Sequence, residues 1–389
     1  MSSQTATPPT YSSPVPPPPP PSGAEALLHP SSPSPFLDEK RHPGEAHLHN
    51  PHTPSSEGAN AQYGFFTPVV SAIARIHSLR KELGLPNPGT VEHLQREVKA
   101  THLTNHFFDG ARADLTKVFS TNPVFQVTHA FSFPIAPNPA GYNFGAVVGD
   151  ERHFLQGGVD DSGAVTMRFN RGWGAGHTSK AQAQLVRGPG SFVQLEHDYQ
   201  GSDHSANVKA LNPGLTDGTG IFMVNYIQSL TRNFALGIET VVQRPSPEVE
   251  EASTGYHAKY VSNNHDWIAT ASMQGVGILQ ATYWQKLAER IDVAADLILV
   301  AVGQKREATA TLGAKWDFRM STLRGQIDST GKISSLFEQR LAPTFSFTVG
   351  GEIDHLKSTS RFGVGFNIES GGEGMDPTQP PPAPPSLPL

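Results

Sequence analysis

The sequence predicts an all-β protein, a transmembrane antiparallel β-barrel, on three observations. From about residue 105 to residue 370, apolar side chains alternate with polar or small ones in one run after another, which is the period of a strand with one apolar and one polar face. Turn-forming Gly, Pro, Asn and Asp residues separate these runs at short intervals. No helical period recurs between the runs, which disfavours a parallel α/β fold.

The last run, residues 357–368, is the clearest single strand. Its apolar face carries Phe362, Val364, Phe366 and Ile368, and its other face is small or polar. The octet from Arg361 has the order polar, any, Gly, any, any, hydrophobic, any, hydrophobic, which resembles the C-terminal targeting signal of mitochondrial outer-membrane β-barrels. The specified positions are Arg361, Gly363, Phe366 and Ile368. An edge strand of a soluble β-sandwich would show the same alternation, so the octet alone leaves both readings open.

Composition excludes several classes of protein. The 389 residues carry a net charge of −6 and only 16% charged residues, against about 25% in soluble domains. Nothing therefore indicates a nucleic-acid partner. The absence of Cys excludes disulfides, thiolate nucleophiles and Cys-type zinc sites. No apolar run reaches the roughly 18 residues of a transmembrane helix.

The two ends of the chain have the composition of disordered segments. Residues 1–62 are rich in Pro, Ser and His, and residues 371–389 form a similar Pro-rich tail. The N-terminus lacks the basic start and apolar core of a secretory signal, and residues 1–39 contain no Arg or Lys, so it is not a cleavable presequence either. We interpret the His residues of the leader as solvated, with no metal.

Residues 63–104 predict a helical segment associated with the pore. Thr67 and Pro68 favour a helix start, and Gly84 favours its end. The apolar stripe of this pore helix is Val69, Ile73, Ile76, Leu79 and Leu83. A second helix is predicted from Thr90, with Val91, Leu94 and Val98 on one side. A helix pair on a soluble domain is the alternative.

Residues 105–370 are predicted to hold the barrel itself. The clearest apolar positions are Val165, Met167 and Phe169; Phe234, Leu236 and Ile238; Val293, Ala295, Leu297 and Leu299; Ala310, Leu312, Ala314 and Trp316; and Phe345, Phe347, Val349 and Ile353. With about 9–11 residues for a membrane strand and roughly 3–5 for a connection, this span holds about 17–22 strands. In lipid an unpaired edge finds no water, which favours closure.

Four segments carry a resemblance to a known family: residues 87–92 (Asn-Pro-Gly-Thr-Val-Glu), 108–114 in the first strand, 154–157, and the octet at 361–368. Over about residues 63–370 the chain resembles the channel-forming subunits of the mitochondrial outer-membrane protein translocase, the TOM complex, in their fungal form. These subunits belong to the eukaryotic porin superfamily.

The resemblance implies a barrel of about nineteen strands, a parallel first and last pair, and one N-terminal helix inside the pore. It implies import of unfolded precursor proteins from cytosol to intermembrane space, with both termini in the intermembrane space. The implied partners are small single-helix subunits, receptor subunits, precursors in transit, membrane lipids and a second copy of the barrel. It implies no covalent chemistry and no cofactor.

Alternation turns a set of carboxylates toward the lumen, since charge on the lipid face is costly. Their screened attraction for Arg and Lys is weak enough to allow release. We therefore expect a lumen that binds cationic presequences through Glu196, Asp198, Glu239, Asp292, Asp296, Asp317, Glu352 and Asp354, with Asp160, Asp161 and Glu338 near strand ends. The alternative is a hydrated lumen in which some pair with Arg168, Lys209 or Lys315.

No catalytic constellation is present, so we expect no enzyme. Asp292 and Asp296 stand about 13 Å apart on a strand, beyond the roughly 5–9.5 Å of glycosidase pairs. Two other functions stay open. A voltage-dependent anion-selective metabolite porin shares the barrel, but the long leader, the two helical segments and the acidic lumen disfavour it. A soluble all-β protein is disfavoured by the repeated apolar faces.

Overall fold

The computed structural model describes residues 83–371, except 105, 136–138, 189, 215 and 304. In chain order the elements are η1 (Val91–His93), α2 (Arg96–Thr101), β1 (Gly110–Thr121), β2 (Val124–Phe133), β3 (Gly141–Gly149), β4 (His153–Asp160), β5 (Val165–Gly174), β6 (His177–Leu185), β7 (Phe192–Gln200), β8 (His204–Leu211), β9 (Gly220–Ser229), β10 (Phe234–Ser246), β11 (Val249–Val261), β12 (Trp267–Gln274), β13 (Ile278–Ala288), β14 (Ile291–Val302), β15 (Lys305–Asp317), β16 (Ser321–Asp328), β17 (Lys332–Ala342), β18 (Phe345–Asp354) and β19 (Thr359–Ser370).

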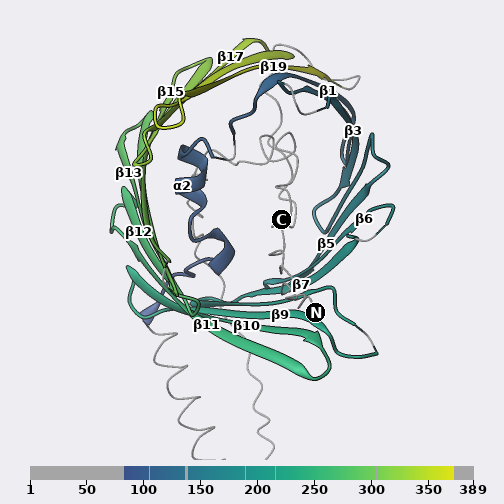
Figure 1. The fold of residues 1–389 in the computed structure, drawn as a ribbon. Coiled ribbons are helices and arrows are strands. Elements are labelled where there is room, and N and C mark those ends of the chain that lie inside the picture. The colour runs from purple at the N-terminus through teal and green to yellow at the C-terminus, as the bar shows by residue number, and fades with distance from the viewer. Residues whose placement is uncertain are drawn as a thin grey trace, which may run out of the picture.

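The strands form one closed barrel. Each pairs with its neighbours in sequence as an antiparallel hairpin, and β1 also pairs with β19 in parallel, from Gly110 opposite Gly363 to Lys117 opposite Ser370. Figure 1 shows the resulting ring of strands with α2 inside it. Closure leaves no free strand edge along the wall, as a wall in lipid requires. The predicted barrel of about nineteen strands with a parallel first and last pair is confirmed by the 19-stranded sheet.

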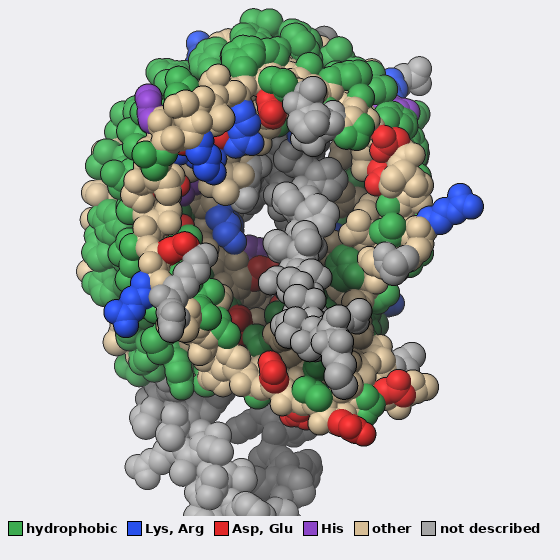
Figure 2. Space-filling model, in the orientation of Figure 1, with side chains coloured by type: hydrophobic (Ala, Val, Ile, Leu, Met, Phe, Trp, Pro, Cys, Tyr) green, Lys and Arg blue, Asp and Glu red, His purple; other side chains and the backbone are tan. Residues whose placement is uncertain are grey.

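The outer wall carries the large apolar side chains. On β19, Phe362, Phe366 and Ile368 are 54%, 45% and 44% exposed, whereas Gly363 and Gly365 are buried on the inner side. Figure 2 shows hydrophobic side chains covering the outer circumference. The alternation that predicted the strands therefore separates an outer apolar wall from an inner polar one.

Inside the barrel, residues 84–104 and 106–109 form what we call the lumen segment. It starts at the rim that carries the β7–β8 turn, where Asn87 Nδ2 donates to the carbonyl oxygens of Gly201 (2.5 Å) and His204 (3.1 Å). Odd-numbered strands run the same way, so β19 ends at this same rim, at Ser370. We call it the terminal rim, because the described chain both enters and leaves the barrel there.

From the terminal rim the lumen segment crosses to the opposite rim along the wall. Leu94 lies in a buried cluster with side chains of β9 and β10. His102 Nε2 donates to the carbonyl oxygen of Ala294 on β14 at 3.3 Å, and the backbone N–H of Leu103 donates to Gln326 Oε1 on β16 at 2.7 Å. The segment thus contacts strands from β9 to β16 before β1 begins.

The helices differ in part from the prediction. The helix expected from Thr90 is divided into η1 and α2, although Leu94 and Val98 are buried as its stripe predicts. Four residues of the expected pore helix, Val69, Ile73, Ile76 and Leu79, lie outside the described residues. Leu83, the fifth, is 58% exposed, and Gly84 has the positive φ of +56° expected at a helix end. No helix in the described part of the chain is long and apolar enough to cross a membrane.

Candidate functional site: the lumen

The structure describes all eleven carboxylates proposed from the sequence. By strand register they face the lumen or lie at a rim: Asp160 and Asp161 at the end of β4, Glu196 and Asp198 on β7, Glu239 on β10, Asp292 and Asp296 on β14, Asp317 on β15, Glu338 on β17, and Glu352 and Asp354 on β18. The structure does not gather them into one patch. Their partners divide them into three groups: neutralised carboxylates, which pair with cations; open carboxylates, which have no Lys or Arg partner; and turn-forming carboxylates, which bind backbone N–H groups.

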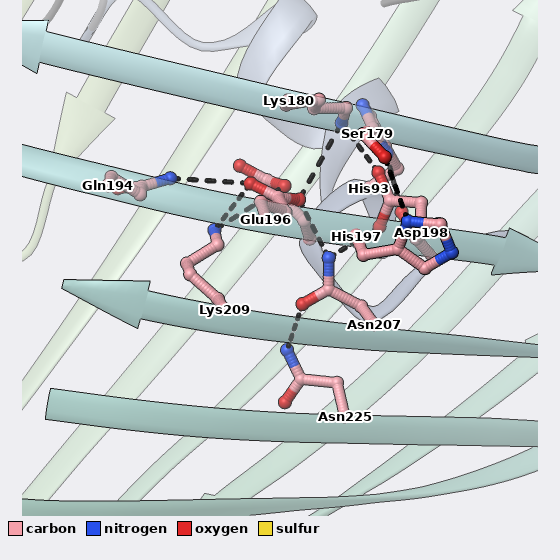
Figure 3. A network of polar contacts seen from close by, with 12 residues as sticks. His93, Ser179, Lys180, Gln194, Glu196, His197, Asp198, Asn207, Lys209 and Asn225 are labelled. Carbon is pink, nitrogen blue, oxygen red and sulfur yellow. Dashed lines mark hydrogen bonds and ion pairs between the residues drawn. The ribbon is translucent and has the colours of Figure 1, made fainter. Parts of the chain in front are cut away.

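Glu196 and Asp198 belong to a buried charge network (Figure 3). Lys180 on β6 lies 2.8 Å from Asp198 and 3.6 Å from Glu196, and Lys209 on β8 lies 3.4 Å from Glu196 and 3.7 Å from Glu92 of η1. Burial alone would raise the pKa of Glu92, but Lys209 and Lys180 outweigh it and lower that pKa. Such pairing offsets the cost of removing charges from water.

Two amides complete this network. Asn207 Nδ2 donates to Glu196 Oε1 at 2.7 Å and also to Asp198, and Asn225 Nδ2 donates to Asn207 Oδ1 at 3.4 Å. The side chains of Glu196 and Asp198 are each only 4% exposed. They therefore hold the wall and η1 together and present little free charge to the lumen.

Glu352 forms a second neutralised site, beside the β1–β19 seam. It accepts hydrogen bonds from Arg361 Nε at 2.9 Å and Ser334 Oγ at 3.1 Å, and it lies 2.9 Å from Lys332 Nζ. Arg361 is also the polar residue of the targeting octet. One carboxylate thus joins β17, β18 and β19 on the lumen side.

Asp317 and Glu338 are also paired with cations. Lys315 Nζ lies 2.6 Å from Asp317, and Arg324 lies 3.8 Å from Glu338. The alternative interpretation, in which some carboxylates pair with Lys209 or Lys315, therefore holds for Glu196 and Asp317. Arg168 instead lies over the ring of Phe154, 5.9 Å from its centre.

The open carboxylates lie on β14 and β10. Asp296 accepts from the neutral amide of Gln280 at 3.0 Å on both oxygens. Asp292 lines a cavity of about 140 Å³ between α2 and the wall. Neither forms an ion pair with another described residue. Glu239 lies 3.8 Å from His257 Nε2.

Two of the rim carboxylates form turns. Asp160 accepts from Ser162 Oγ at 2.6 Å and from the N–H of Ala164 at 2.8 Å. Asp354 accepts from the N–H groups of Leu356 and Lys357 at 3.0 and 2.9 Å. These contacts shape the β4–β5 and β18–β19 turns. Asp161 is exposed beside the first of them.

The sequence analysis named Lys209 as a partner of the lumen carboxylates but missed Lys180, which pairs with both carboxylates of β7. Lys180 alternates with Ser179 and Ala181, so its lumen orientation was readable from the sequence. Its pairing with Asp198 was not, because the strand register that aligns β6 with β7 is a property of the folded barrel. Asn207 and Asn225 carry no sequence signal beyond polarity.

The outer wall near the terminal rim carries a row of aromatic rings. Tyr260 stacks on Trp267 with ring centres 4.9 Å apart, and Trp267 lies 5.8 Å from Tyr283. Farther along, His177 lies 4.5 Å from Tyr199. Amphipathic rings gather at the membrane–water interface, so the row marks one boundary of the apolar wall.

A closed barrel of this strand number, with an apolar outer wall, a polar lumen and an internal segment, defines a membrane channel of the mitochondrial porin class. Residues 87–363 match the family model described as eukaryotic porin. The chain is 39% identical over 317 residues to the mitochondrial import receptor subunit tom40 of Neurospora crassa, which covers 78% of this chain and 89% of that protein.

Two further proteins named TOM40 or TOM40 homolog are also similar to the chain. The identity is 37% over 324 residues with TOM40 of Saccharomyces cerevisiae, covering 78% of this chain and 84% of the relative. It is 28% over 301 residues with the human TOM40 homolog, covering 73% and 79%. The chain therefore belongs to the eukaryotic porin family, in its branch of mitochondrial import receptor subunits TOM40. As a member of that branch it is a β-barrel protein of the mitochondrial outer membrane.

Proposed function

We propose that the chain is the protein-conducting channel of mitochondrial import, which passes unfolded precursor proteins from the cytosol to the intermembrane space. Its TOM40 relatives are named as import receptor subunits, and no covalent step is part of the proposal. The polar lumen suits an extended polypeptide, which must be held by contacts weak enough to release it. A metabolite porin of the same class is the second candidate, and no observation favours it.

Within the lumen, we propose that Asp292 and Asp296 contact cationic presequences, with Glu239 as a weaker site. The observation that supports this choice is the difference in partners. Glu196 and Glu352 each pair with two cations and Asp198 pairs with Lys180, whereas Asp292 and Asp296 have no ion pair within 4 Å among the described residues. Lys286 and Lys315 stand opposite Asp292 in the strand register but form no ion pair with it within 4 Å. A passing Arg or Lys can therefore approach either carboxylate without displacing a cation in direct contact.

The position of the terminal rim and the apolar outer wall also suggest how the barrel is oriented in the membrane and which partners it contacts. We propose that the terminal rim faces the intermembrane space, so that the leader and the tail lie on that side. The outer wall would contact lipids, small single-helix subunits, receptor subunits and a second copy of the barrel. We also propose that the chain is divided at residues 62, 104 and 370 into leader, helical segment, barrel and tail. Residues 1–82 and 372–389 lie outside the described residues.

The test is single-channel conductance of the purified protein in a planar bilayer, with a cationic presequence peptide on one side. The native channel should prefer cations and be blocked by the peptide in a voltage-dependent way. The variant Asp292→Asn/Asp296→Asn should shorten each blocked event by about twofold to thirtyfold, because each exposed ion pair is worth roughly 0.2–1 kcal/mol.

Glu289→Gln is the matched control, since Glu289 is an exposed carboxylate in the β13–β14 turn. It should leave the blocked time unchanged. An anion-preferring pore indifferent to the peptide would identify a metabolite porin instead. Equal effects of the double variant and the control would assign presequence binding to other residues.

A further inference from the structure

The lumen face of β19 carries a slot whose floor is glycine. A Cβ placed on Gly365 would lie 2.9 Å from Phe108 Cζ, closer than real side-chain contacts allow. A Cβ on Gly363 would overlap the carbonyl oxygen of Phe108 and lie 3.1 Å from its Cδ2 and Cε2. The ring of Phe108, the last aromatic residue of the lumen segment, therefore lies directly on both glycines.

The preceding residue, Phe107, extends this contact onto β18. A Cβ on Gly350 would lie 3.3 Å from Phe107 Cε2. The guanidinium of Arg361 lies over the ring of Phe107, 5.6 Å from its centre, and donates a hydrogen bond to Glu352. Phe107 thus contacts both a glycine of β18 and a cation of β19.

These contacts fall on the targeting octet in a specific way. Arg361 and Gly363, its polar and glycine positions, face the lumen. Gly363 is buried under Phe108, whereas Arg361 contacts Phe107 and Glu352 and stays 49% exposed. Phe366, its first hydrophobic position, faces outward, and its ring lies 6.2 Å from that of Phe345. Two of the four specified positions are therefore contacted from inside once the barrel is closed.

We infer that the lumen face of β19, the strand that carries the targeting octet, is a binding slot for an aromatic side chain. Phe108 fills this slot and so acts as a latch that stabilises the pairing of β1 with β19. No short turn connects β1 to β19, because Gly110 and Gly363 lie at opposite ends of the barrel sequence, and their pairing must close a long loop. Parallel pairing is also slightly weaker per residue than antiparallel pairing. Phe108 precedes β1 by two positions, so its seating on Gly363 aligns the first strand with the last.

The latch has a consequence for assembly. Before closure, the polar and glycine positions of the octet are free to be read by assembly factors. After closure, Phe108 covers Gly363, and Arg361 is bound by Glu352 and contacts Phe107. The lumen segment then contacts β19 in the same step in which the glycine position of the targeting octet becomes inaccessible.

Gly365→Ala tests the latch separately from the signal, because position 365 is unspecified in the octet and its order stays intact. The extra methyl group fills the slot. We expect the yield of closed, heat-modifiable barrel to fall about fivefold to a hundredfold, the range typical of an overpacked contact. Gly351→Ala is the matched control: it makes the same change on β18, where an added Cβ meets nothing within 4 Å, and it should close normally.

Phe108→Ala completes the comparison. On its own it should leave membrane targeting intact and increase the rate at which the closed barrel opens in denaturant. In the Phe108→Ala background, Gly365→Ala should have little further effect, because the side chain it collides with is gone. Equal behaviour of Gly365→Ala and Gly351→Ala, or independent effects of Phe108→Ala and Gly365→Ala, would overturn the latch.

A second measurement follows the contact itself. A photoreactive phenylalanine analogue at position 108 keeps the ring and should crosslink to residues 363–365 in the closed barrel. In a time course of membrane assembly, this crosslink should appear together with closure. Closed barrels that lack the crosslink would also refute the inference.

Discussion

Lys259 on β11 donates a hydrogen bond of 2.8 Å to the carbonyl oxygen of Pro88 in the turn before η1. A cation of the barrel wall therefore holds the backbone of the Asn87-Pro88-Gly89 turn inside the lumen. Asn87 is fixed at the same point by Ser205 Oγ, which donates to its side-chain oxygen at 3.1 Å. Together these contacts fix where the lumen segment begins its path across the barrel.

Lys259→Met should loosen that turn while keeping the apolar stem of the side chain. A hydrogen bond from a charged group contributes about 1.5–3 kcal/mol, so local opening of residues 86–101 should become about ten- to a hundredfold more frequent. Amide hydrogen exchange of this segment in detergent-solubilised protein measures the change. Unaltered exchange, with the strands equally protected, would show that Asn87 and the hydrogen bond from Ser229 to the Pro86 carbonyl hold the turn without Lys259.

Lys180→Met tests the charge network on β7. Removing one partner leaves Glu196 and Asp198 buried with too little positive charge, which costs about 3–5 kcal/mol in comparable buried pairs. The free energy of unfolding in urea should fall by about that amount. Adding Asp198→Asn to Lys180→Met should recover part of the loss, because it removes an unmatched charge.

Lys315→Met is the control for Lys180→Met, because it makes the same change in another ion pair on the lumen face. Lys315 and Asp317 are more exposed, at 22% and 40%, so its loss should cost no more than about 1 kcal/mol. Equal losses for Lys180→Met and Lys315→Met would show that burial does not distinguish the two ion pairs.

Acidification should weaken the docking of α2 through His102. Burial lowers the pKa of this His below its usual value, against smaller opposing effects of the Ala294 carbonyl and Asp296. The unfolded segment therefore binds a proton more readily than the folded one. The stabilisation is complete above the unfolded pKa of about 6.5 and declines as the pH falls from there toward the folded pKa.

Hydrogen exchange of residues 96–103 between pH 7.5 and 5.5, corrected for intrinsic rates, measures this effect. His102→Gln keeps a donor for the Ala294 carbonyl and should flatten the dependence. Burial also lowers the pKa of His93, so a smaller residual slope centred on η1 should remain. A full slope in His102→Gln would assign the effect to His93.

Gly363→Leu and Phe366→Gln test the targeting octet on its two faces. Leu at 363 meets Phe108, and Gln at 366 places an amide against lipid, which is unfavourable. Both should reduce the fraction of protein that resists carbonate extraction after import, whereas Phe362→Ile, at an unspecified apolar position, should not. Normal assembly of both variants would eliminate the octet as the signal.

The class of fold and the two faces of the wall can be predicted from the amino-acid pattern. Alternation placed Phe362, Phe366 and Ile368 outward and Glu196, Asp292 and Glu352 inward, because a period of two leaves a strand only two faces. The length of the alternating region predicted the strand number, since membrane thickness determines the length of each strand. The octet and the resemblance identified the family that the comparisons then showed.

Which inward carboxylates are free of an ion pair depends on contacts made only in the folded barrel. Lys180 meets Asp198, and Arg361 meets Glu352, only through the register of neighbouring strands, and register depends on the whole closed barrel. The path of the lumen segment was hidden for a similar reason, because His102 and Phe108 contact strands far away in the sequence. Alternation is a local property of the backbone, whereas neutralisation and seam closure depend on contacts that exist only after the barrel has formed.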